Sequence, residues 1–84
     1  MLKINDITAT PYRYRVDGTQ YGIFALQGFT SDGGKTFRWT IKVDHMDPIE
    51  NVPVFPAQQF YSPESALQAL VAWESSVTIN NRVP

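Results

Sequence analysis

The sequence predicts an α+β fold in which an antiparallel three-stranded β-meander packs against one C-terminal helix. Three observations support this prediction. Residues 35–43 alternate apolar and polar side chains with the period of a strand. Two glycine-centred turns precede this segment, and a helix start follows it at residues 62–64. With 84 residues, the chain has the length of one small domain, and we expect residues 1–84 to form a single one.

The strands are predicted at residues 8–16, 20–29 and 35–44, separated by turns around Gly18 and Gly33. A two-residue turn at Asp32-Gly33 would place Phe24 opposite Ile41. A three-residue turn at Val16-Asp17-Gly18 would place Tyr12 opposite Gly22. Both registers gather the large apolar side chains on one face of the sheet, which we take as the core. This predicted core face contains Tyr12, Tyr14, Phe24, Leu26, Phe37, Trp39, Ile41 and Val43.

The proline-rich segment 46–61 interrupts the strand pattern, because each proline removes a backbone donor. The segment is nevertheless too apolar for a disordered linker, so we expect an ordered connection that packs along the sheet edge. Residues 77–79, near the other end of the chain, alternate again. This alternation is compatible with a short fourth strand at the C-terminus.

A helix start is encoded by Ser62 as N-cap, Pro63 at the first helical position and Glu64 near the positive end of the helix dipole. We expect the helix to run to about Ser75. Its apolar stripe should cover the core face of the sheet. The stripe is predicted to contain Ala66, Leu67, Leu70 and Val71, with Trp73 or Glu74 at its margin.

One helix can cover only one side of such a sheet, so the other side, here called the reverse face, is left to water or to a partner. The predicted registers place cations and apolar residues together on this face. The candidate binding residues are Arg13, Arg15, Tyr21, Ile23, Phe29, Arg38 and Lys42. Ala25, Gln27, Thr36 and Thr40 are expected on the same face.

This mixture favours a small protein-interaction module, which would be an adaptor or inhibitor of a larger protein or would self-associate as a homodimer. An ordinary solvated face with a few isolated apolar residues is the simpler alternative. Single-stranded nucleic acid is a third, because sheet platforms bind it with cations and stacking rings. An isoelectric point of about 5.6 argues against nucleic acid, since typical binders are strongly basic.

Catalysis is not expected, because the sequence contains no nucleotide motif, no nucleophile dyad and no set of metal ligands. His45, the one histidine, stands among Asp44, Asp47 and Glu50, a pattern typical of a strand end. We therefore predict no enzyme activity, no cofactor, no bound metal and no small-molecule substrate.

The charge is unevenly distributed along the chain. Residues 1–43 carry six Lys and Arg against three Asp, whereas residues 44–84 carry one Arg against five Asp and Glu. Such opposed charges can steer partners of either sign. The chain has no cysteine, no secretory signal pattern and no apolar run of the roughly 20 residues that span a bilayer, so a soluble cytoplasmic protein without a membrane partner is expected.

Overall fold

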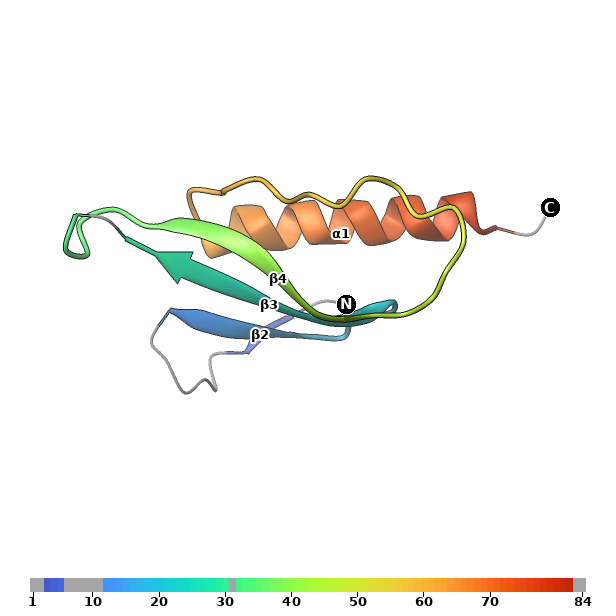
Figure 1. Cartoon of the computed structure of the whole chain (residues 1–84), viewed down its shortest axis with the longest axis horizontal. Helices are drawn as coiled ribbons and strands as arrows, with labels where there is room; N and C mark the ends of the chain where they lie inside the picture. Colours follow the sequence, from blue (N-terminus) through green and yellow to red (C-terminus); the bar gives the residue numbers. More distant parts are fainter. Residues whose placement is uncertain (1–2, 6–11, 31, 83–84) are drawn as a thin grey trace.

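The computed structural model describes residues 3–5, 12–30 and 32–82. Its regular elements are the strands β1 (Lys3–Asn5), β2 (Arg13–Asp17), β3 (Gly22–Phe29) and β4 (Arg38–Met46) and the helix α1 (Pro63–Asn80). The strands form one antiparallel sheet in chain order, and α1 lies along one side of it (Figure 1). The predicted α+β meander with a C-terminal helix is therefore confirmed.

The additional strand lies at the opposite end of the chain from the one that the sequence suggested. β1 pairs with β2 near the N-terminus, where Lys3 lies opposite Asp17. Residues 77–79, in contrast, form the last turn of α1 rather than a strand. Val77 is fully buried and stands four residues after Trp73, so continuing the helix keeps both side chains on the buried stripe. Tertiary burial thus overrides the local alternation.

The register between β3 and β4 differs by two residues from the prediction, because the turn between them is longer. Phe24 lies opposite Val43 instead of Ile41. The Asp32 carboxylate accepts hydrogen bonds from the backbone N–H groups of Lys35 and Thr36, at 3.1 and 2.9 Å, which folds these residues into the loop. A shift by two residues leaves every side chain on its predicted face.

In the first hairpin, β2 continues further towards the turn than predicted. Val16, assigned to the turn by the sequence, lies in β2 opposite Phe24 and is buried in the core. Tyr12 therefore does not face Gly22, and the loop comprises residues 18–21. The predicted start of this strand at residue 8 lies outside the described residues, which resume at Tyr12. The shift again involves an even number of residues, so Tyr14 stays on the core face beside Leu26.

The core lies between α1 and the centre of the sheet. The helix contributes a stripe that is rotated relative to the predicted one, because Leu67 is only half-buried and Val71 is exposed. Val43, expected in the core, is also exposed near the end of β4. The observed core contains Val16, Phe24, Leu26, Trp39, Ile41, Ala66, Leu70, Trp73 and Val77.

Residues 47–62 run along the helix side of the sheet, as Figure 1 shows. The Phe55 ring stacks on Phe24, with centroids 5.8 Å apart, and meets Trp73 edge-on at 5.1 Å. The indole N–H of Trp73 donates to the Pro53 carbonyl at 3.1 Å. Phe60 and Trp39 exchange two backbone hydrogen bonds of 2.7 Å, so the connection also pairs with the edge of β4, in agreement with the prediction.

Candidate functional site

The reverse face begins with the alternation along β3. Phe24 and Leu26 point into the core and are fully buried, so Ile23 and Phe29 point to the other side of the sheet. Ile23 is 54% exposed and Phe29 is 42% exposed. Six residues separate them, which corresponds to about 20 Å along a strand. The face therefore offers two separate apolar contact points.

An ion pair lies between these two points. Arg13 of β2 donates to the carboxylate of Asp44 in β4 at 2.7 Å. Arg13 lies opposite Gln27, whereas Asp44 sits in a bulge where β4 pairs with Ile23 and Phe24, so the pair crosses β3 diagonally. This crossing is consistent with the burial of the small Ala25 side chain beneath it, although Ala25 points away from the core.

Two further cations of the face are engaged within the chain. Arg15 donates to the Asp17 carboxylate at 3.1 Å. The Arg38 guanidinium lies 4.4 Å from the centre of the Tyr61 ring, a cation–π distance, and also donates to the Phe37 carbonyl. Arg13 and Arg15 are therefore paired with carboxylates, whereas Arg38 contacts a ring and a carbonyl and keeps its positive charge.

Lys42 differs from the three arginines. It is exposed, it lies opposite Ala25, and it makes no hydrogen bond or ion pair with another part of the chain that the structure describes. Its ammonium group carries a positive charge that no carboxylate of the described residues pairs with.

Tyr21 does not belong to the reverse face, contrary to the sequence prediction. Because the first hairpin loop extends to Tyr21, this residue precedes β3 and does not follow the alternation of the strand. Its ring meets Trp73 edge-on with centroids 6.4 Å apart, and its hydroxyl shares a hydrogen bond with Thr78 of α1. The Tyr21 carbonyl accepts from the backbone N–H of Asp47 at 2.8 Å. Tyr21 thus fastens the hairpin loop to the helix.

Two residues of the face escaped the sequence reasoning. Asp44 joins it because of the β-bulge, and Tyr61 joins it because the long connection returns to the start of β4. No local signal announces either event, since both depend on contacts between segments distant in the sequence. A strand-end aspartate among basic strands is the one hint, because it offers a partner to Arg13.

His45 Nε2 lies 3.1 Å from Asp47 Oδ1, at the end of β4. Across residues 3–5, 12–30 and 32–82, no group of three His, Cys, Asp or Glu side chains is placed to hold a metal ion. Within the same ranges, no helix combines the length and the hydrophobicity required to cross a membrane.

The fold defined by these elements is a four-stranded meander covered on one side by a helix. Neither a model of a protein family, nor a curated protein, nor a solved structure matches this chain. The surfaces that the fold presents are therefore what indicates its function.

Proposed function

We propose that this chain is a small, non-catalytic protein-interaction module that binds its partner through the reverse face of the sheet. It acts either as an adaptor or inhibitor of a larger protein or by pairing with a second copy. The observation that carries the proposal is the exposure of Ile23 and Phe29 on the side of the sheet opposite α1. Complete burial of an exposed side chain of this size contributes about 1.5–3 kcal/mol, and a partner that covers the exposed half of each gains roughly half of that.

The charges of the face favour a protein partner over phosphates. A phosphate that approached Arg13 would have to compete with Asp44, and Arg15 already binds Asp17. An ion pair within the face, in contrast, can be covered by a partner without leaving either charge uncompensated. Lys42 and Arg15 are exposed on this face, and exposed charges steer association more than they add affinity.

Matched variants test the proposal. Ile23→Glu and Phe29→Glu put a charge at each contact point, and Val54→Glu is the control because Val54 is 95% exposed in the connection. Size-exclusion chromatography with light scattering, at high micromolar concentration, measures the self-association form. A dimer that is lost in the first two variants and kept in the control supports it.

A monomer from which no partner is recovered by affinity capture would contradict the proposal. Binding of oligonucleotides at low salt that weakens in Arg13→Ala or Arg38→Ala would instead support the single-stranded nucleic-acid alternative. The location in the cytoplasm belongs to the same proposal and stays a prediction from the sequence.

A further inference from the structure

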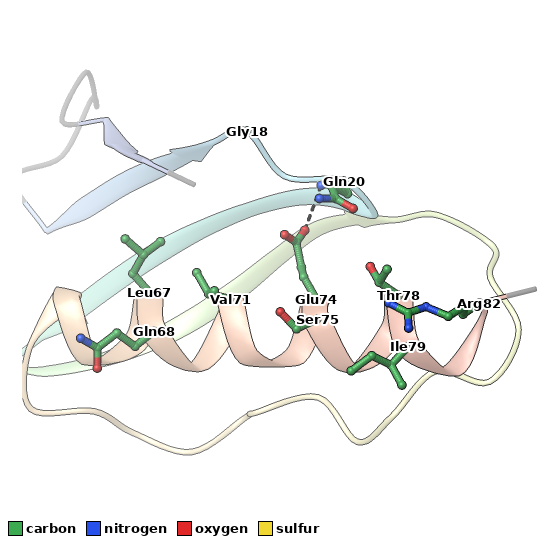
Figure 2. Close-up of a pocket in the computed structure, with 10 residues that line it drawn as sticks. All are labelled: Gly18, Gln20, Leu67, Gln68, Val71, Glu74, Ser75, Thr78, Ile79 and Arg82. Carbon is green, nitrogen blue, oxygen red and sulfur yellow. Dashed lines mark hydrogen bonds between the residues drawn. The ribbon is translucent and has the colours of Figure 1, made fainter. Parts of the chain in front are cut away.

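A groove of about 700 Å³ lies on the helix side of the sheet, between α1 and the loop that joins β2 to β3 (Figure 2). Its helical wall carries the apolar side chains of Leu67, Val71 and Ile79. The loop contributes Gly18 and Gln20 on the opposite side. This surface is separate from the reverse face, because the two lie on opposite sides of the sheet.

The groove exists because α1 carries more apolar residues than the sheet covers. Ala66 and Leu70 face the sheet and are fully buried. Leu67 and Val71 each follow one of them by a single residue, a rotation of about 100° around the helix, and they line the groove instead. Val71 is 43% exposed and Ile79, two turns further, is 62% exposed. A second apolar stripe therefore runs along the helix.

Glu74 gives the groove a charge of defined position. The residue is only 5% exposed, and its Oε2 accepts a hydrogen bond from the backbone N–H of Gln20 at 2.9 Å, as the dashed line in Figure 2 shows. Its other oxygen, Oε1, makes no hydrogen bond with the described residues. No side-chain oxygen among these residues is both buried and without a partner, so Oε1 opens to the groove.

A largely desolvated carboxylate with an open oxygen gains from a cation or a strong donor. Arg82, two residues beyond the end of α1, lines the same groove but forms no ion pair with Glu74. No ion pair joins Glu74 to another described residue. The groove thus combines an apolar wall with an acidic position near its middle.

We propose that this groove binds a peptide segment of a partner protein, with apolar residues against Leu67, Val71 and Ile79 and a lysine or arginine against Glu74. The distance from Leu67 to Ile79 along the helix is about 18 Å. This length suits an elongated occupant, since an extended chain of five or six residues covers it. The acidic position selects a basic residue near the middle of that segment.

The test uses the full chain and a phage-displayed library of random twelve-residue peptides as the probe. Peptides that the wild-type chain enriches should carry apolar residues around a lysine or arginine. Synthetic copies of these peptides are then titrated against variants. Glu74→Gln keeps an oxygen that accepts from Gln20 but removes the charge, and we expect it to weaken binding about tenfold or more, as loss of a charge-assisted hydrogen bond does.

Val71→Asp should weaken binding of the same peptides, because it replaces an apolar contact of the wall with a hydrated group that the apolar residues of the peptide would have to desolvate. Val54→Asp on the exposed connection and Ile23→Glu on the reverse face serve as controls and should leave the affinity unchanged. Near-UV circular dichroism checks that each variant keeps its tertiary packing.

Four results would overturn the inference. The first two are a library that yields no peptide above background and peptides whose affinity Glu74→Gln and Val71→Asp leave unchanged. Self-association that Val71→Asp removes would instead place a second copy in the groove. Peptides lost only in Ile23→Glu would support the reverse face and refute the groove, so the two proposals can fail separately.

Discussion

The two sides of β3 show how one strand serves two purposes. Phe24 and Leu26 meet α1 and the connection and are fully buried, whereas Ile23 and Phe29 keep about half of their surface in water. The four residues share a strand and are all large and apolar, so the difference arises from the single helix, which covers one side alone. In so short a chain, alternating residues of one strand therefore either build the core or stay exposed, and the exposed ones are those that we propose for recognition.

The largest expected difference in stability is between variants of the two phenylalanines of β3, one on each side of the strand. Phe24→Ala should lower the free energy of unfolding by about 3–5 kcal/mol, because it removes a buried ring that contacts Phe55 and Trp73. Phe29→Ala should lower it by less than about 1 kcal/mol, since Phe29 is exposed. Urea unfolding followed by circular dichroism measures both. Equal losses would show that the two faces do not differ as described.

Two neighbouring residues of β3, Gly28 on the core face and Gln27 on the reverse face, should also differ in their tolerance of alanine. A Cβ atom at Gly28 would lie 2.8 Å from the Trp39 ring, so Gly28→Ala should cost about 1–3 kcal/mol through overpacking. Gln27→Ala changes the neighbouring residue on the reverse face and should alter stability by no more than about 0.5 kcal/mol. Thermal unfolding of the two variants provides the measurement, and a neutral Gly28→Ala would contradict the packing of Trp39 on this strand.

The N-cap of α1 stabilises the helix that covers the core face of the sheet. Ser62 accepts a hydrogen bond from the backbone N–H of Ser65 at 3.1 Å, so Ser62→Ala should cost about 1 kcal/mol. Ser76→Ala, at an exposed position of the same helix, is the control and should not destabilise. Urea midpoints of the two variants decide the point, and equal midpoints would argue against capping by Ser62.

The smallest expected effect concerns the turn around Asp32, which determines which residues of β3 and β4 lie opposite each other. Hydrogen bonds from the side chain and backbone of Thr36, and then from Thr30 and Lys35, lower the pKa of Asp32 from 3.8 to about 2. The folded state therefore binds this proton less readily than the unfolded state. The resulting stabilisation is complete above pH 4 and is lost as the pH falls towards 2.

Carbon NMR titration of the Asp32 carboxyl measures this pKa directly, and Asp32→Asn should remove the corresponding part of the acid dependence of unfolding. A titration midpoint near 4 would mean that the loop does not hold the carboxylate in the way described.

The alternation predicted the faces of residues 38–43 correctly even though the registers were wrong, whereas Lys35 and Thr36 lie in the loop. Both register errors involved an even number of residues, and such a shift preserves the side of each residue that stays in a strand. Loop length could not be predicted, because it depends on the hydrogen bonds that gather around Asp32. The longer first loop is also why Tyr21 was assigned to the wrong side.

The predicted end of α1, at about Ser75, was wrong for a different reason, since the helix runs to Asn80. Val77-Thr78-Ile79 alternates like a strand, but Val77 stands four residues after Trp73 and both are buried, which favours a helix. The groove was not predicted, because the predicted apolar stripe of α1 combined two sets of residues. Ala66 and Leu70 face the sheet, whereas Leu67 and Val71 line the groove. Burial decided between the two, and burial is a property of the tertiary structure.

We propose that this protein meets its partner on the uncovered side of the sheet. Quantitative affinity capture from the protein's own cells tests it most directly, with the wild-type chain, an Ile23→Glu/Phe29→Glu variant and the Val54→Glu control as baits. We expect the wild type and the control to retain the same interacting proteins, including any second copy, and the double variant to lose them while remaining folded. Retention of the same proteins by all three baits would contradict the claim.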